Sequence, residues 1–423
     1  MQRVASKWFW LVAVLLVGLL LAGCGGGSGK QSQSEGQLGQ QKEQTPRQEV
    51  AAEGITPDAI KVGIVPDVTG PTGDIGVQSQ AGWDTYFKLV NEQGGINGRK
   101  LELKVEDGQY DQSREISLFK KLHTQDQVFT VVDVWTTGAN QALLPDYIKE
   151  KNIVFPQSRA TFMFEPEQNP YVFITSPPYH IGYYAQVDYV AKEKPGAKIG
   201  VMYPDNTFGQ DGFKWIKKRA GEKGLTVVPE VFNLSDVDAT SQLTNLKNAG
   251  VDYVLLVQAG LQGAVIFKAA DQLQFKAPFI LNYNTTEPPL IELAGNTEAI
   301  KNAVGVTFYA TFAEDVPGIK QVEEMAQKYG VEKKLYYSQW YLMTWTDAMV
   351  FTEGLRKAGD NPTTDTLKEA IESLQDFNTG GLTAPLSYSA SRHYGSKQVK
   401  YVKANVEKGY FEPVSDWYTP EEG

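Results

Sequence analysis

The sequence predicts an α/β protein built from two doubly wound parallel sheets, and three observations support this fold class. Short β-branched runs alternate with amphipathic helical segments over residues 60–282, which is typical of βαβ units. The alternation breaks near residues 171–178, where YVFITSPP ends in a proline pair, and then starts again. A further apolar run at residues 304–312 offers a second place where the chain crosses between the two halves.

The N-terminal residues predict export. Arg3 and Lys7 precede an apolar run at residues 8–22, and Leu-Ala-Gly comes directly before Cys24. A basic start, an apolar stretch and small residues before a cleavage site form the pattern of a secretory signal. The run is shorter than the roughly 20 residues that span a bilayer, which argues against a retained membrane anchor. The Leu-Ala-Gly-Cys ending resembles the bacterial lipobox, which implies cleavage after residue 23 and diacylation of the Cys24 sulfur; the alternative is a cysteine that is there by chance.

The folded part of the chain is predicted to begin after a tether. Residues 25–54 consist mainly of Gly, Ser, Gln and Glu, a composition that buries too little apolar surface to fold. We therefore predict a signal peptide at 1–23, a lipidated Cys24 with a disordered tether over 24–54, and a folded body from residue 55. Because Cys24 is the only cysteine, an internal disulfide and a thiolate metal cluster are both excluded.

Composition and motifs exclude several classes of function. The net charge of −10 argues against nucleic-acid binding, because such proteins need a basic surface to neutralise phosphates. The three histidines lie far apart in the sequence, and no Gly-x-Ser-x-Gly elbow is present. Gly70, Gly73 and Gly76 follow the first predicted strand, but their spacing fits neither a dinucleotide motif nor a P-loop. We expect no enzymatic activity, no cofactor and no metal.

The individual elements follow from local patterns. Strands are predicted where β-branched and apolar residues cluster or alternate, and helices where apolar residues recur on one face between Gly, Pro and capping residues. The predicted strands cover residues 60–66, 101–106, 128–134, 153–155, 171–178, 198–203, 225–232, 253–258, 278–282 and 304–312. The predicted helices cover residues 77–91, 113–123, 143–151, 181–192, 210–223, 240–248 and 263–273.

Two polar turns follow neighbouring strands within residues 128–161. Turns at the carboxyl ends of parallel strands lie side by side, at the edge where open α/β sheets bind ligands. Hydroxyl and guanidinium groups in these turns suit an anionic or polar head group. The side chains concerned are Thr136, Thr137, Ser158, Arg159 and Thr161. The alternative is that both are ordinary turns at a solvated edge.

The order and spacing of these segments resemble the type I periplasmic binding proteins of the branched-chain amino acid (Leu/Ile/Val) class, which are receptors of ABC importers. IKVGIVPDVTGPTGDIG is similar to that family's first strand and Gly-Pro turn, and Gly-Gly-Ile-Asn-Gly at 94–98 to the stop after its first helix. YPDNTFG at 203–209 resembles the first turn of the second lobe, and Gly-Gly-Leu-Thr at 380–383 its final re-entry.

The resemblance implies two α/β lobes joined by three hinge crossings, with a ligand in the cleft between them. The crossings are expected near Ser176, Thr311 and Thr379. Lobe one then comprises residues 55–176 and 312–378, and lobe two comprises 177–311 and 379–423. The lobes are expected to close over the ligand, because binding favours the form in which both contact it.

The resemblance also implies which residues bind the ligand. The family holds a carboxylate at two turns of lobe one, and an aromatic residue of the first lobe-two turn covers it. We also expect Trp340 to form an aromatic wall of the site. The alternative is that Trp340 only packs in the core of its helix. The positions implied in this sequence are Trp135, Thr136, Thr137, Arg159, Ala160, Thr161, Phe208, Gln258, Tyr283 and Trp340.

The sequence departs from the family where the substrate ammonium is held. The family's lobe-two acid, which pairs with the ammonium, falls near Tyr283 in this sequence, and the nearest carboxylate is Glu287. At two positions where the family has an aromatic residue, this sequence has Ile75 and Ala259. A buried ammonium without an anion costs several kcal/mol, whereas Arg159 is able to pair with a carboxylate. We therefore expect a carboxylate or amide ligand with an apolar or aromatic body. The alternative is that the alignment slips and Glu287 is the acid.

These inferences predict an extracytoplasmic solute receptor, anchored by lipid to a bacterial membrane at the cell surface or in the periplasm. Its expected partners are a small ligand and ABC permease subunits, and the protein is expected to be a monomer. The alternative function is a ligand sensor that passes its closed form to a membrane signalling protein.

Overall fold

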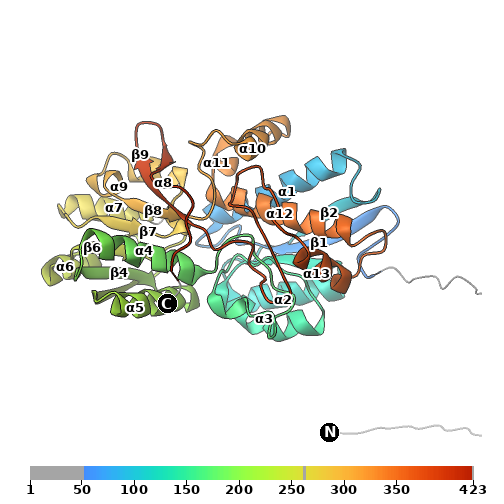
Figure 1. The fold of residues 1–423 in the computed structure, drawn as a ribbon, viewed down its shortest axis with the longest axis horizontal. Coiled ribbons are helices and arrows are strands. Elements are labelled where there is room, and N and C mark those ends of the chain that lie inside the picture. The colour runs from blue at the N-terminus through green and yellow to red at the C-terminus, as the bar shows by residue number, and fades with distance from the viewer. Residues whose placement is uncertain (1–51, 261–262, 422–423) are drawn as a thin grey trace, which may run out of the picture. The chain divides into compact units, whose positions relative to one another are not determined.

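A computed structural model of the chain describes residues 52–260 and 263–421. The predicted signal peptide, Cys24 and nearly all of the predicted tether lie outside these residues. The described strands form two sheets, and Figure 1 shows each sheet with its own group of helices. We call the part around the three-stranded sheet the first lobe and the part around the seven-stranded sheet the second lobe. The predicted α/β fold with two parallel-sheet lobes is confirmed.

The described elements have the following bounds. The strands are β1 (Ala59–Val65), β2 (Lys100–Val105), β3 (Thr130–Val134), β4 (Lys198–Pro204), β5 (Thr226–Phe232), β6 (Tyr253–Leu256), β7 (Phe279–Leu281), β8 (Val304–Thr307), β9 (Lys400–Asn405) and β10 (Tyr410–Pro413). The helices are α1 (Gly73–Glu92), α2 (Gln112–Thr124), α3 (Thr137–Lys149), α4 (Tyr179–Glu193), α5 (Thr207–Glu222), α6 (Thr240–Ala249), α7 (Gly263–Gln272), α8 (Pro288–Ala294), α9 (Glu298–Lys301), α10 (Pro317–Lys328), α11 (Lys333–Tyr336), α12 (Gln339–Lys357) and α13 (Thr364–Glu372), with 3-10 turns η1 (Thr161–Met163) and η2 (Tyr283–Thr285).

The first lobe is organised around a parallel sheet of order β2-β1-β3. All five residues of β3 are buried, as expected for a strand that is covered on both faces. The segment after α3 runs beside β3, because the Phe155 N–H donates to Val132 O at 2.7 Å and the Gln157 N–H to Val134 O at 3.1 Å. This segment forms only a single bridge, Val154 to Val172, instead of the predicted strand at 153–155. Pro156, which lies between Phe155 and Gln157, has no N–H to extend a strand ladder.

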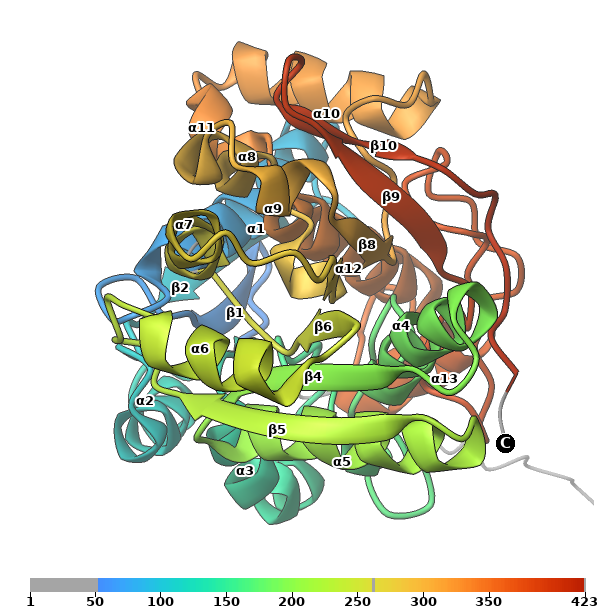
Figure 2. The same cartoon turned by 90° about the vertical axis from the view of Figure 1, so that its left-hand side faces the viewer.

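The second lobe is organised around a sheet of order β10-β9-β8-β7-β6-β4-β5. Strands β4 to β8 are parallel, whereas β9 is antiparallel to β8 and β10 to β9. Figure 2 shows β9 and β10 as a hairpin that extends this sheet. The C-terminal part of the chain therefore returns to the second lobe.

Helices α10 to α13 lie in the sequence between strands β8 and β9 of the second lobe. Among them, α12 packs along α1 of the first lobe. The helices approach closely at Gly82, where an added Cβ would lie 2.1 Å from Thr344 Oγ1 and 2.6 Å from Tyr341 O. Trp83 next to it is fully buried, and its ring meets the Phe351 ring edge-on at 6.3 Å. Close approach at a glycine, flanked by aromatic packing, fixes the position of α12 on the first lobe.

Three segments link the lobes: the first around Ile174 and Ser176, the second around Ala310, and the third over residues 379–393, which is hydrogen-bonded to both others. The Ile174 N–H donates to His393 O at 3.0 Å, and the Ala310 N–H donates to Leu382 O at 2.6 Å. Leu386 and Tyr388 belong to the same buried cluster as Trp83, so the third segment still packs with the first lobe beyond the predicted crossing near residue 379.

Several predicted boundaries shift for local reasons. Helix α3 starts at Thr137 and not at residue 143, because Thr136 Oγ1 accepts the Ala139 N–H at 3.2 Å and caps it. Strand β8 ends at Thr307, and residues 308–312 continue as a linking segment. Residues 171–178 form single bridges in place of the predicted strand, since two prolines follow Ser176 and cannot donate to a ladder.

Candidate ligand-binding site

A small hollow lies between the lobes, at the carboxyl ends of their strands. Its volume is about 30 Å³, far below the roughly 300–1,000 Å³ of small-molecule pockets, so a ligand body fits only after the lobes separate. Its walls come from the β3–α3 turn and α12 of the first lobe and from the turns after β4, β6 and β7 of the second. We call it the interlobe hollow, lined by Ile75, Tyr110, Trp135, Thr136, Thr137, Gln157, Tyr179, Phe208, Ala259, Asn284 and Trp340.

The interlobe hollow adjoins a second space of about 140 Å³. The two share Tyr110, Thr136, Thr137 and Phe208. The lobes meet at this opening, where Asn206 Nδ2 of the second lobe donates to Tyr110 Oη of the first at 3.3 Å. The hollow is therefore closed by contacts between the lobes and not by one lobe alone.

Aromatic rings form much of the wall. Trp135 and Trp340 lie 5.3 Å apart between ring centroids, at an angle of 30°. On the second-lobe side of the hollow, the Phe208 ring meets the Tyr179 ring edge-on, with 5.4 Å between the ring centroids. Such rings bury a large apolar area with a defined geometry, so the hollow suits the apolar or aromatic body of a ligand.

The hydroxyls of the β3–α3 turn are held by neighbouring side chains. Thr136 N and Oγ1 both donate to Glu115 Oε2, at 2.8 and 3.0 Å. Thr137 Oγ1 accepts from Ser158 Oγ at 3.0 Å, so the two predicted turns are in direct contact. Burial raises the pKa of Glu115 to about 8, against the hydrogen bonds from Thr136, which lower it.

Arg159 is fully buried and does not line the interlobe hollow. Its Nη2 lies 3.3 Å from Asp347 Oδ2 on α12, and its Nε donates to Ser176 Oγ at 3.0 Å in the first linking segment. Asp347 also accepts from Thr175 Oγ1 at 2.7 Å. The guanidinium thus has an acid partner, which the sequence analysis did not identify, and it ties the polar turn to the linking segment.

Glu287 has a structural partner as well. Both carboxylate oxygens accept the Gln339 N–H, at 3.0 and 3.2 Å, so this second-lobe side chain contacts the N-terminus of first-lobe helix α12, where negative charge is favoured. Burial raises its pKa to about 8. Glu287 is absent from the lining of the interlobe hollow.

Half of the predicted site residues line the interlobe hollow and half lie nearby. Trp135, Thr136, Thr137, Phe208 and Trp340 are in the lining. Arg159, Ala160, Thr161, Gln258 and Tyr283 are not. Among the latter, Thr161 Oγ1 bonds His180 Nδ1 at 2.8 Å, and Gln258 Nε2 donates to Ala259 O at 2.8 Å. Tyr283 stacks on Phe308 at 4.4 Å.

The lining contains polar atoms that have no hydrogen-bond partner among the described residues. These atoms are Gln157 Oε1, Asn284 Oδ1, Asn284 Nδ2 and Trp340 Nε1. Buried polar atoms without partners are rare in folded proteins, so these four atoms are candidates for contact with a ligand. The sequence analysis missed Gln157 and Asn284, although both follow predicted strands at 153–155 and 278–282.

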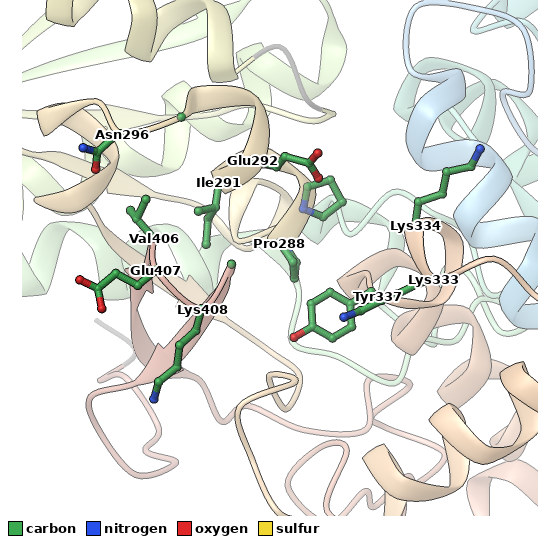
Figure 3. A pocket seen from close by; sticks show the side chains of 13 residues that line it. Pro288, Ile291, Glu292, Asn296, Lys333, Lys334, Tyr337, Val406, Glu407 and Lys408 are labelled. Carbon is green, nitrogen blue, oxygen red and sulfur yellow. The ribbon is translucent and has the colours of Figure 1, made fainter.

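A larger cavity lies elsewhere, across α8, α11 and the turn between β9 and β10 (Figure 3). Its volume is about 660 Å³, and none of the predicted site residues lines it. We call it the outer cavity, lined by Pro288, Pro289, Ile291, Glu292, Gly295, Asn296, Lys333, Lys334, Tyr337, Val406, Glu407, Lys408 and Gly409. Its lysines and glutamates are largely exposed.

Within residues 52–260 and 263–421, no cluster of His, Cys, Asp or Glu is suited to hold a metal ion. In the same part of the chain, no helix is long and apolar enough to cross a membrane.

Comparison with known proteins gives consistent matches over the α/β body. A family model described as periplasmic binding protein matches residues 59–409. Leu/Ile/Val-binding protein homolog 1 of Brucella suis biovar 1 is 28% identical over 359 residues, which cover 83% of this chain and 91% of the relative. The leucine-, isoleucine-, valine-, threonine-, and alanine-binding protein of Pseudomonas aeruginosa is 22% identical over 321 residues, or 73% and 81% of the two chains.

Solved structures share the fold. A branched chain amino acid ABC transporter structure from Thermus thermophilus with bound valine has a TM-score of 0.81 and 26% identity, covering 86% of this chain and 97% of that one. A fatty acid ABC transporter substrate-binding protein from Thermomonospora curvata has a TM-score of 0.78 and 22% identity, covering 88% and 95%. These matches confirm the resemblance that the sequence motifs indicated.

Proposed function

The chain belongs to the periplasmic binding protein family, whose members are substrate-binding receptors and not enzymes, and we propose that it delivers a small ligand to an ABC importer. Family membership places the folded body outside the cytoplasm. The observation that carries the proposal is the interlobe hollow, whose lining from both lobes includes unpartnered buried polar atoms. A ligand that contacts both lobes stabilises the closed form.

The proposed ligand has an apolar or aromatic body and one polar head group. Trp135, Trp340 and Phe208 supply the apolar walls. The relatives are named for leucine, isoleucine and valine or for a fatty acid, and the fold alone does not choose among such ligands. We include amino-acid-like, carboxylate and amide head groups in the proposal, and we assign Arg159 to positioning the turn because its guanidinium already has Asp347 and Ser176 as partners.

The proposed receptor hinges on the three linking segments and is attached to the membrane as a monomer. The proposed lobes are residues 55–176 with 312–378 and residues 177–311 with 379–423, except that Leu386 and Tyr388 of the last range pack in the first-lobe core. The signal-like start and the Leu-Ala-Gly-Cys motif support cleavage before Cys24 and lipidation of its sulfur. Mass spectrometry of the N-terminal peptide tests this proposal, and Cys24→Ser is expected to release the protein from membranes.

A ligand screen by thermal shift tests the receptor function. The compounds are leucine, isoleucine, valine, short apolar carboxylates, aromatic carboxylates and the corresponding amides. A ligand present at one hundred times its Kd adds about 2.7 kcal/mol to the free energy of unfolding, which is readily detected. If no compound of these classes stabilises the folded protein, the proposed ligand class is wrong.

A further inference from the structure

The unpartnered atoms of the interlobe hollow have a definite hydrogen-bonding pattern. Gln157 Oε1 and Asn284 Oδ1 are acceptors, whereas Asn284 Nδ2 and Trp340 Nε1 are donors. All three side chains are at least nine-tenths buried, with exposed fractions of 2%, 1% and 4% for Gln157, Asn284 and Trp340. A complementary head group therefore offers two donors and accepts two hydrogen bonds.

The orientation of the Gln157 amide is set by a buried neighbour. Gln157 Nε2 donates to Asp133 Oδ2 at 2.6 Å, and Trp83 Nε1 donates to the same oxygen at 3.1 Å. The indole N–H of Trp83 can only donate, so Asp133 Oδ2 acts as an acceptor and is matched by the amide nitrogen of Gln157, which leaves the amide oxygen unpartnered. The backbone is fixed as well, because the Gln157 N–H donates to Val134 O at 3.1 Å.

Asn284 contributes from the second lobe. It is the middle residue of η2, directly after β7, and both polar atoms of its side chain are without partners within the described part of the chain. A buried amide that makes no internal hydrogen bond loses its hydration without compensation. A ligand that pairs with Gln157 and Asn284 together bridges the two lobes.

The charge of the lining is equally restrictive. Every side chain that is known to line the hollow is uncharged. The buried ionisable groups next to it have hydrogen-bond partners, since Glu115 accepts from Thr136, Glu287 from Gln339 and Asp133 from Gln157, and Arg159 pairs with Asp347. A charged head group would therefore lose its hydration without gaining a counter-ion.

We propose that the head group bound in the interlobe hollow is an uncharged primary carboxamide, recognised by Gln157 from the first lobe and Asn284 from the second. A carboxamide has two N–H donors and a carbonyl oxygen with two lone pairs, which matches two acceptors and two donors. A carboxylate has no donor for Gln157 Oε1 and Asn284 Oδ1. An ammonium has no acceptor for Asn284 Nδ2 and Trp340 Nε1, and a zwitterionic amino acid carries both uncompensated charges. This inference rests on the proposed receptor function and narrows its ligand class.

Calorimetric titration of the full-length protein in detergent tests the inference with matched ligands. One set is 4-methylpentanamide, 4-methylpentanoate and leucine, which share a carbon skeleton; the other is 3-phenylpropanamide, 3-phenylpropanoate and phenylalanine. In at least one set, the amide is expected to bind 100-fold or more tightly than its carboxylate and its amino acid, because a site built for hydrogen bonds rejects analogues that leave its polar groups unpaired. A carboxylate or amino acid that binds as tightly as its amide overturns the inference, and so does the absence of amide binding at millimolar concentration.

Two variants assign the recognition to individual side chains. Asn284→Leu is expected to weaken amide binding at least tenfold while leaving the fold intact, because its side chain makes no internal hydrogen bond. Gln157→Leu is expected to weaken it similarly and also to lower thermal stability, because Asp133 loses a donor. Asn296→Leu, in the outer cavity, is the matched control and is expected to leave affinity unchanged. Unchanged amide affinity in a folded Asn284→Leu protein contradicts the proposal.

The failure of this inference is distinguishable from failure of the receptor function. The variant Ala259→Trp fills the interlobe hollow from the second lobe. If leucine or a carboxylate binds more tightly than the amide and Ala259→Trp abolishes that binding, the receptor function stands and the carboxamide inference is wrong. If amides bind equally well to Ala259→Trp, they bind elsewhere and both proposals are wrong.

Discussion

The interlobe hollow and the outer cavity differ in almost every physical property. The volume of the hollow is about 30 Å³ and that of the outer cavity about 660 Å³. The charged side chains of the outer cavity are exposed, and two of its lysines form surface ion pairs: Lys334 with Glu332 and Lys408 with Glu412, both at 2.9 Å. The hollow is lined by aromatic rings and by buried polar atoms that have no partners in the described chain.

This difference teaches that volume is a poor guide to a ligand site. A large, open cavity lets water satisfy its polar groups, so a ligand gains little by displacing that water. A buried polar atom without a partner costs free energy that a matching ligand recovers. The interlobe hollow is therefore the better candidate for the ligand site, although it is the smaller space.

The largest effect is expected from filling the hollow. Ala259→Trp places an indole among rings that already pack closely and should reduce ligand affinity more than 1000-fold, since no room remains for a ligand body. Glu292→Trp adds the same group to the outer cavity and should leave affinity unchanged. Calorimetry with whichever compound the thermal screen identifies provides the measurement. Equal loss in both variants would show that the two spaces do not differ in function.

A second large effect concerns stability and separates the buried charge beside the hollow from an exposed charge of the outer cavity. Arg159→Met leaves Asp347 as a buried charge without its cation and should lower the free energy of unfolding by about 3–5 kcal/mol. Lys333→Met removes an exposed cation and should change it by less than about 0.5 kcal/mol. Urea unfolding measures both values. A small loss for Arg159→Met, together with abolished ligand binding, would return Arg159 to the role of a carboxylate ligand.

The same comparison shows what the sequence was able to predict. Strand and helix order followed from β-branched runs and amphipathic periods, and the polar turn at Thr136 and Thr137 was placed correctly at the hollow because parallel strands end at one edge. The partner of Arg159 was not predictable, because Asp347 lies 188 residues away on a helix whose aromatic residues dominate the pattern. Pairs that form only when α12 returns to the first lobe leave no local signal.

The sequence also did not predict which polar atoms of the hollow lack hydrogen-bond partners. Gln157 was visible in a polar turn, but its role depends on Asp133, which is an acid within the apolar strand β3. Asn284 stands within LNYNT, where the resemblance implies Tyr283 because the family's acid falls near that position. Which polar atoms remain unpaired is decided by the packing of two lobes, and neither hydrophobic period nor motif spacing encodes that outcome.

A smaller effect is expected in the pH dependence of stability. Burial raises the pKa of Glu287 from its ordinary value of 4.5 to about 8. The folded state therefore holds a proton that the unfolded state has lost, so this group favours folding most below pH 4.5, and its contribution is lost as pH rises to about 8. Each pKa unit corresponds to about 1.4 kcal/mol, so Glu287→Gln should raise stability at pH 8 by up to a few kcal/mol and flatten the profile.

The control for this profile lies in the outer cavity. Glu407→Gln changes an exposed side chain and should leave the slope of unfolding free energy against pH as it is in the parent protein. Chemical denaturation at pH values from 4.5 to 8 measures all three proteins. If Glu287→Gln keeps the parent slope, the carboxyl group is ionised throughout and its hydrogen bonds from Gln339 outweigh its burial.

The smallest effect is expected at the surface of the outer cavity. Lys408 and Glu412 form a pair at 2.9 Å, and their side chains are 57% and 38% exposed. Exposed pairs of this kind contribute about 0.2–1 kcal/mol, so Lys408→Ala should lower the free energy of unfolding by no more than that and alter ligand affinity less than twofold. Parallel urea unfolding and calorimetry test both values. A tenfold loss of affinity in this variant would mean that the outer cavity takes part in ligand capture, because no local stability effect of that size is available to account for it.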